Sequence, residues 1–190
     1  MIMLKKYYRI LKKELINLIQ IPIVNYPHSK LSNKLRAFYY KKVLQIGSNP
    51  LILNNFDIIS KDLIKFGNRV QINKNVTMDA SGSLGIYIGN RVLIGPGCYF
   101  RSANHSFSDD SSIVDQGWDF KRIPFEGTDY SIIIEDDVWI GANSIILSGA
   151  HIGKGSVLSA GAVVSSSIPE MSIVVGNPGR VVKQRQSRSN

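Results

Sequence analysis

One histidine lies where the repeating pattern of this sequence is interrupted. His105 lies in RSANHSFSDD (101–110), where a regular spacing of isoleucines stops, and the spacing resumes only at IIIEDDVWIG (132–141). A neutral imidazole accepts protons near neutral pH, so it can serve as a general base toward a hydroxyl group. Two interpretations stay open: His105 is a catalytic base, or it is a hydrogen-bonded polar residue at the end of a strand.

The other histidines and the single cysteine are weaker candidates. His28 and His151 lie far from His105 along the chain, so a three-histidine zinc site of the γ-carbonic anhydrase type is not indicated, and we expect no metal. We expect His151 to be structural. Cys98 reads as a core residue, and a lone cysteine excludes an intramolecular disulfide, which favours a reducing, cytoplasmic location.

Large apolar residues recur at every sixth position from residue 46 onward. A period of six, with Gly, Asn, Ser and Asp between the apolar positions, fits short strands that turn at each corner of a triangular coil. Stacked coils would bury a continuous apolar column. The sequence therefore predicts an all-β fold, a parallel β-helix of about five coils. The positions are Ile46, Ile52, Ile58, Phe66, Ile72, Met78, Ile88, Ile94, Phe100, Ile134, Ile140, Ile146, Ile152, Leu158 and Val164.

The breaks in this spacing fall at coil boundaries. We expect one corner to carry every insertion, and we expect His105 and His151, as the last residues of the third and fourth coils, to stack one coil apart. The long excursion contains aromatic and acidic residues, including Trp118, Phe125 and Glu126, and is predicted to be an ordered loop facing a polar ligand. The predicted coils are 46–63, 66–83, 88–105, 134–151 and 152–169, with insertions at 64–65, 84–87 and 106–133.

Positive charge is concentrated at the two ends of the chain. Residues 1–45 hold ten Lys and Arg but one acidic residue, whereas the repeat region 46–169 lacks the basic stripe of a nucleic-acid-binding protein. We expect three parts: a basic helical segment (1–45), the β-helix (46–169, with the excursion loop 106–133) and a basic tail (170–190). No nucleic-acid partner is expected.

The first 24 residues predict an amphipathic helix. Charges at Lys12, Lys13 and Glu14 interrupt its apolar run, which argues against a membrane-spanning segment or a signal peptide. Two alternatives remain: the helix packs on protein, or it makes peripheral contact with the inner face of a membrane. A second helix is predicted from the cap Ser29, with Leu31, Leu35 and Phe38 on one face.

The hexads from IEDDVW to VSSSIP, followed by VVGNPGRVV, resemble the hexapeptide-repeat acyltransferases, and the resemblance covers roughly residues 44–185. It implies a left-handed parallel β-helix, a homotrimer and transfer of an acetyl group from acetyl-CoA in clefts between subunits. The nearest branches are the galactoside, maltose and surface-polysaccharide acetyltransferases. These imply a saccharide acceptor.

The resemblance also assigns roles to individual residues. ANHSF matches the segment of the catalytic histidine, which implies His105, and VWIGA implies that Trp139 lies near the active centre. Relatives often carry Thr-Lys where this chain has Ser165 and Ser166, and Lys183 or Arg185 could compensate. The positions that match coenzyme contacts are Ala142, Ala160, Ser165, Ser166 and Arg180, with Lys183 added to this set.

The expected chemistry is direct O-acetylation in a ternary complex. His105 would deprotonate a sugar hydroxyl of a cell-surface polysaccharide or its precursor, with Asp79 or Glu126 as a candidate acidic partner. Three other functions stay open. They are acetylation of an antibiotic hydroxyl, N-acetylation of an amino-sugar nucleotide, and a non-enzymatic binding role for the β-helix.

Overall fold

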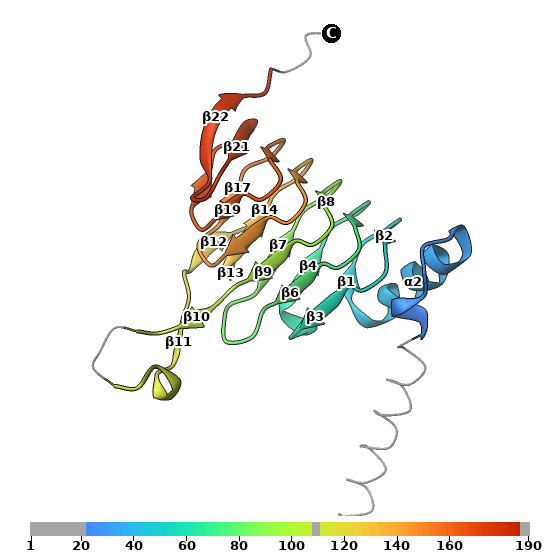
Figure 1. Ribbon diagram of the computed structural model, residues 1–190, viewed down its shortest axis with the longest axis horizontal. Coiled ribbons are helices and arrows are strands. Elements are labelled where there is room, and N and C mark those ends of the chain that lie inside the picture. The colour runs from blue at the N-terminus through green and yellow to red at the C-terminus, as the bar shows by residue number, and fades with distance from the viewer. Residues whose placement is uncertain (1–21, 108–110, 187–190) are drawn as a thin grey trace, which may run out of the picture.

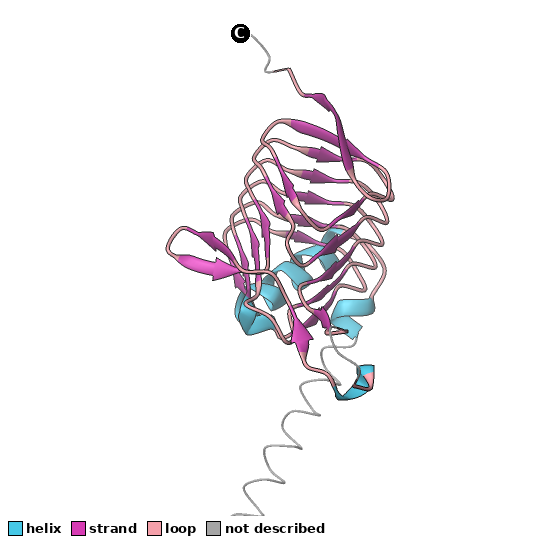
Figure 2. Cartoon of the chain, turned by 90° about the vertical axis from the view of Figure 1, so that its left-hand side faces the viewer, coloured by secondary structure: helices cyan, strands magenta, loops and turns pink. Residues whose placement is uncertain are grey.

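Three parallel sheets form the three sides of a triangular column (Figures 1 and 2). The computed structural model describes residues 22–107 and 111–186. The first sheet contains β1 (Gln45–Ile46), β4 (Ile64–Phe66), β7 (Ile86–Ile88), β14 (Ile132–Ile134), β17 (His151–Ile152) and β20 (Ser167–Ile168). The second contains β2 (Leu51–Ile52), β5 (Gln71–Ile72), β8 (Leu93–Ile94), β15 (Trp139–Ile140), β18 (Val157–Leu158), β21 (Ser172–Val175) and β22 (Arg180–Gln184). The third contains β3 (Asp57–Ile59), β6 (Thr77–Asp79), β9 (Tyr99–Arg101), β16 (Ile145–Leu147) and β19 (Val163–Val164).

The sixfold spacing predicts the strand register correctly. On the first side Ile88 pairs with Phe66 and Ile134, and on the third side Phe100 pairs with Met78 and Ile146. The chain completes five coils and adds two sides of a sixth, β20 and β21. The predicted all-β parallel β-helix is confirmed.

Regular corners explain why the apolar positions stay in register. Two corners of the triangle use one residue in the left-handed conformation, which asparagine, aspartate and glycine adopt most readily. At the first–second corner these residues are Asn49, Arg69, Arg91, Asp137 and Gly155, and at the second–third corner they are Asn55, Asn75, Gly97, Asn143 and Gly161. Each coil therefore turns at the same place, and the inward apolar side chains of successive coils stack along the column.

Large apolar side chains fill the inside of the column. Ile52, Ile72, Ile94, Ile140 and Leu158 on the second side are at most 1% exposed, as are the corresponding residues of the other two sides from the second coil to the fourth, apart from Phe66 at 6%. No single coil encloses a core by itself, so burial comes from stacking on the neighbouring coils. This gives a rigid support for groups on the outer surface.

Different elements cover the two ends of the column. The helix α2 (Lys30–Val43) packs on the first coil through the hydroxyl of Tyr40, which donates to the carbonyl of Phe56 at 3.0 Å. Ser29 caps α2 and forms a capping box with Ser32, as the sequence predicts for the start of this helix. At the other end β22 folds back antiparallel on β21, after a cis peptide bond at Asn177–Pro178.

All three insertions leave from the corner between the third and first sheets, as predicted. The shortest contains the 3-10 helix η1 (Lys61–Leu63), and the second runs from Ala80 to Gly85. The long excursion contains β10 (Asn104–His105), η2 (Ile113–Asp115), β11 (Trp118–Asp119), β12 (Ile123–Phe125) and β13 (Thr128–Tyr130). In Figure 2 it projects from one side of the column.

The predicted stacking of His105 on His151 is wrong. His151 lies in the first sheet, where it pairs with Ile133 and Ser167, but His105 pairs with Trp118 in an antiparallel ladder outside the coil. The coil ends earlier than expected, at Arg101, because Asn104 and His105 find their hydrogen-bonding partners within the excursion. His105 therefore belongs to the excursion itself.

The predicted amphipathic helix of residues 1–24 lies almost entirely outside the described residues, which begin at residue 22. Within the described ranges, no helix has the length and apolar character needed to cross a membrane.

Candidate active site

His105 stands exposed at the root of the excursion and stacks on an aromatic ring. Its ring centroid lies 4.5 Å from that of Trp118, with 33° between the ring planes. Backbone pairing of His105 with Trp118 sets this contact, since directly opposed residues of an antiparallel pair present their side chains on the same face. The imidazole is thus oriented and still open to a substrate.

An ion-paired arginine also contacts Trp118. The guanidinium carbon of Arg101 lies 4.8 Å from the Trp118 ring centroid, a cation–π distance. Arg101 Nη1 also lies 2.5 Å from Asp79 Oδ2 and donates to Ser81 Oγ at 3.0 Å. Both charged side chains are about 15% exposed, so their geometry is well restrained. Asp79, Arg101, Trp118 and His105 form a continuous chain of contacts from coil to imidazole.

The second insertion packs closely against the Trp118 ring through Gly82. Gly82 has φ +70°, and a Cβ placed there would lie 2.5 Å from Trp118 Cγ. Glycine is therefore required at this position for two reasons, its left-handed backbone and the close approach of the indole. The 80–85 insertion and the long excursion form one structural unit.

Sequence reasoning missed Arg101. The hexad register contained the signal, because Asp79 and Arg101 follow the paired inward residues Met78 and Phe100 and must be neighbours on adjacent strands. Opposite charges at such positions predict an ion pair. The contact of Arg101 with Trp118, however, required the path of the excursion.

Neither predicted acidic partner contacts His105. Asp79 binds Arg101, and Glu126 lines a separate cavity of about 190 Å³ with Tyr87, Glu135 and Lys154. In the described part of the chain His105 has an aromatic neighbour and no carboxylate partner. Its orientation therefore depends on stacking.

His151 is held by other groups, consistent with a structural role. Its Nε2 lies 2.6 Å from Glu135 Oε1, and Glu135 Oε2 accepts from the backbone N–H of Lys154 at 3.0 Å. Phe125 packs edge-on against the His151 ring at a centroid distance of 5.8 Å. These contacts fix the β12–β13 hairpin and the neighbouring coil against each other.

Trp139 and His105 are not brought together within one chain. Trp139 is 51% exposed on the outer face of the second sheet, where it pairs with Leu93 and Val157. His105 follows a strand of the third sheet. The two residues therefore belong to different sides of the column.

The candidate coenzyme residues fall into two groups. Ala142 and Ala160 occupy the second–third corner of successive coils, where the N–H of Gly161 donates to the carbonyl of Ala142 at 2.8 Å. Ser165 and Ser166 are exposed after β19, at the same corner from which the excursion leaves two coils earlier, after β9. The N–H of Lys121, in the excursion, donates to Ser148 Oγ at 2.7 Å near this corner.

The two predicted basic contacts lie on β22. Arg180 pairs with Val175 and Lys183 with Ile173, and both are exposed. The preceding turn is fastened to the fifth coil, since the N–H of Gly179 donates to the carbonyl of Val163 at 2.7 Å. Both cations are therefore exposed on the last strand of the second sheet, after a turn that contacts the third sheet at Val163.

Cys98 is unsuited to nucleophilic catalysis. It is 1% exposed, and burial raises the pKa of its thiol. Its Sγ lies 3.1 Å from the carbonyl of Gly141 in the core. Across the described residues, no three His, Cys, Asp or Glu side chains gather as ligands for a metal ion.

Comparison with known proteins identifies similar sequences and similar folds. The hexapeptide repeat of succinyl-transferases matches residues 131–166. A hexapeptide-repeat acetyltransferase from Vibrio cholerae O1 biovar eltor, solved with acetyl coenzyme A, is 29% identical, with TM-score 0.70 over 90% of this chain and 85% of that one. The repeat sequence and the fold of this chain are therefore similar to those of hexapeptide-repeat acetyltransferases.

Two further similar proteins differ from each other in their chemistry. A 2,3,4,5-tetrahydropyridine-2,6-dicarboxylate N-acetyltransferase of Staphylococcus aureus (strain JH9) is 51% identical over 53 residues, which is 28% of this chain and 22% of that protein. The match thus spans about a fifth of the curated relative. A maltose O-acetyltransferase from Clostridium difficile 630 shares the fold at 24% identity, with TM-score 0.66 over 92% of this chain and 84% of that one.

Proposed function

We propose that the protein is an acetyl-CoA-dependent O-acetyltransferase that acts on a sugar hydroxyl of a cell-surface polysaccharide or its precursor. The observation that carries this proposal is the exposed His105, stacked on Trp118 at the root of the excursion. A scaffold role would not require an oriented, solvent-accessible imidazole supported by a partly buried ion pair.

His105 acts as the general base. It removes the proton of the acceptor hydroxyl as that oxygen attacks the thioester carbonyl carbon, and the tetrahedral intermediate then expels the coenzyme thiolate, which takes up the proton from the imidazolium. Trp118 and Arg101 position the imidazole. A displacement of about 1 Å can cost about 10²-fold in rate, so such support is functionally significant.

The coenzyme lies along the third sheet and its corners. Exposed Arg180 and Lys183 meet its phosphates, and Ala142, Ala160, Ser165 and Ser166 line its path. The structure of the Vibrio cholerae relative with acetyl coenzyme A supports this choice of donor. The active unit is a homotrimer, with Trp139 of one copy facing His105 of its neighbour.

N-acetylation is the second candidate, favoured by the 51% identity of the repeat to an N-acetyltransferase. The acyl bond formed distinguishes the two. Purified protein is incubated with radiolabelled acetyl-CoA and either surface polysaccharide or an amino-sugar nucleotide, and the product is treated with alkaline hydroxylamine. An ester loses its label and an amide keeps it. Hydroxylamine-stable label on an amino sugar alone would overturn the O-acetylation proposal.

A further inference from the structure

The helix α2 buries its polar face and exposes its apolar face, which is the reverse of an ordinary surface helix. Its inward residues are polar or amphipathic, namely Ser32, Arg36 and Tyr40, all at most 4% exposed. Its outward residues are apolar: Leu31 is 69% exposed, Leu35 48% and Phe38 61%. A helix that packs on its own domain normally buries its apolar stripe.

Arg36 fixes this orientation. Its side chain is fully buried, and it donates to the carbonyls of Ile52 at 3.0 Å and Tyr26 at 2.8 Å, as well as to Asn33 Oδ1 at 2.7 Å. If the helix rotated, the buried guanidinium would lose these hydrogen bonds, and the buried donors and acceptors would be left unsatisfied. The apolar stripe therefore stays on the outside.

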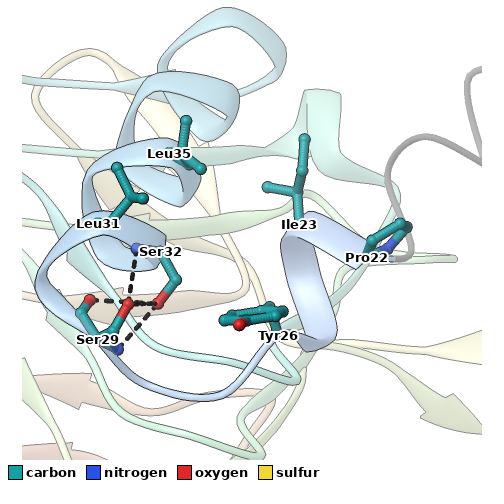
Figure 3. Close-up of a pocket in the computed structure, with 7 residues that line it drawn as sticks. All are labelled: Pro22, Ile23, Tyr26, Ser29, Leu31, Ser32 and Leu35. Carbon is teal, nitrogen blue, oxygen red and sulfur yellow. Dashed lines mark hydrogen bonds between the residues drawn. The ribbon is translucent and has the colours of Figure 1, made fainter.

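The exposed stripe continues across a neighbouring turn. A cavity of about 340 Å³ lies between α2 and residues 22–26, and apolar side chains of Ile23, Tyr26, Leu31 and Leu35 line it, as Figure 3 shows. Tyr26 is itself 61% exposed. The helix and the turn thus present one apolar face.

The charge beside this face is uniformly positive. Lys30, Lys34, Lys41 and Lys42 are exposed on α2, and the sequence contains no acidic residue between Glu14 and Asp57. Lys42 Nζ lies 4.3 Å from the centroid of the Phe38 ring, so charge and apolar surface adjoin. A second copy of the same face would bring like charges together, which opposes self-association through it.

We propose that α2 docks on an anionic phospholipid surface. Leu31, Leu35 and Phe38 would enter the interfacial region, and the lysines would contact phosphate groups of the lipid heads. This inference does not depend on the proposed function, because no residue of α2 belongs to the candidate active site.

The test is co-sedimentation of the full chain with vesicles of phosphatidylcholine alone or mixed with phosphatidylglycerol. We expect binding to the anionic vesicles that weakens as salt is raised. The double variant Leu35→Ser with Phe38→Ser should bind at least about tenfold more weakly, because it loses two apolar groups. The control changes the exposed Ile113 and Val114 to Ser and should bind normally.

A second pair of variants tests charge. Lys34→Gln and Lys41→Gln should each reduce binding about fivefold, whereas Lys61→Gln and Lys74→Gln, exposed elsewhere on the column, should not. Acetyl transfer to a soluble acceptor should be unchanged in the α2 variants, which separates this proposal from the catalytic one.

Three outcomes would overturn the proposal. The first is failure of the unmodified chain to bind anionic vesicles, and the second is equal binding by the Leu35→Ser, Phe38→Ser variant. The third is a lower molar mass or a lower Tm for that variant without loss of vesicle binding. That result would mean that a second copy or another segment of the chain covers the stripe.

Discussion

The residues that contact and support His105 are distant from one another in the sequence. Asp79 and Arg101 come from adjacent coils, and Trp118 comes from the far arm of the excursion. An exposed histidine by itself samples several rotamers, whereas a stacked ring does not. This arrangement predicts different effects for loss of the base and loss of its support.

Replacing His105 by Ala should lower kcat by about 10² or more, because the acceptor hydroxyl loses its base. Binding of acetyl-CoA, measured by calorimetry, should persist. His28→Ala serves as the control, since His28 is exposed and its side chain hydrogen-bonds to Asn33, far from the candidate site. Near-normal turnover by a folded His105→Ala protein would contradict the assignment of the base.

Trp118 should act through His105. Trp118→Ala should lower kcat about 10- to 100-fold with little change in KM for acetyl-CoA, and Trp118→Phe should restore most of the rate because it keeps a ring against the imidazole. Steady-state kinetics separates the two parameters. A rise in KM alone would show that Trp118 binds the coenzyme instead.

Gly82→Ala tests the same support without altering either ring. The added Cβ would overlap Trp118, so kcat should fall as it does for Trp118→Ala. Gly127→Ala is a matched control, because Gly127 has a similar φ of +76° and nothing within 4 Å of an added Cβ. Equal effects of the two variants would indicate backbone strain in place of a contact with the indole.

At the scale of elements, α2 is attached to the column by buried polar groups. Burial raises the pKa of Tyr40, whose hydroxyl donates to Phe56. The folded state therefore holds the phenolic proton more tightly than the unfolded state does. The resulting stability is fully present below the ordinary tyrosine pKa of 10.0 and is lost as pH rises above it.

Urea unfolding at increasing pH checks this. The free energy of unfolding should decline above about pH 10, and Tyr40→Phe should reduce the decline while lowering stability at pH 7 by about 1 kcal/mol through the lost hydrogen bond. Tyr26→Phe, at an exposed tyrosine, should leave both unchanged. An unaltered alkaline decline in Tyr40→Phe would show that Tyr40 does not contribute to it.

At the scale of the whole molecule, the separation of His105 from Trp139 favours a shared site. A side chain on the second sheet of one column can face the third-sheet corner of another column when three columns pack around an axis. Light scattering should then give about 63 kDa, three times the 21.1 kDa chain.

Mixed assemblies provide the sharper measurement. If each site combines His105 of one copy with Trp139 of its neighbour, co-expressed His105→Ala and Trp139→Ala chains should regain activity in about a quarter of their sites. A mixture with no more activity than the separate variants would show that each site uses one chain only.

The sequence by itself determined the repeating part of the fold. Ile46, Phe66, Ile88 and Ile134 could be aligned from the sequence, because the apolar positions within each coil are six residues apart and large apolar side chains fill its interior. The corner used by the insertions followed from the same count. The position of His105 near the excursion was likewise predictable.

Tertiary structure alone decided what surrounds that histidine and which way α2 faces. Non-repeating segments have no neighbouring copies to set their register, so the pairing of His105 with Trp118 replaced the predicted stack on His151. Leu31, Leu35 and Phe38 share a face, as their spacing requires, but the buried hydrogen bonds of Arg36 turn that face outward. Periodicity defines which residues lie together, whereas the available hydrogen-bond partners decide where they point.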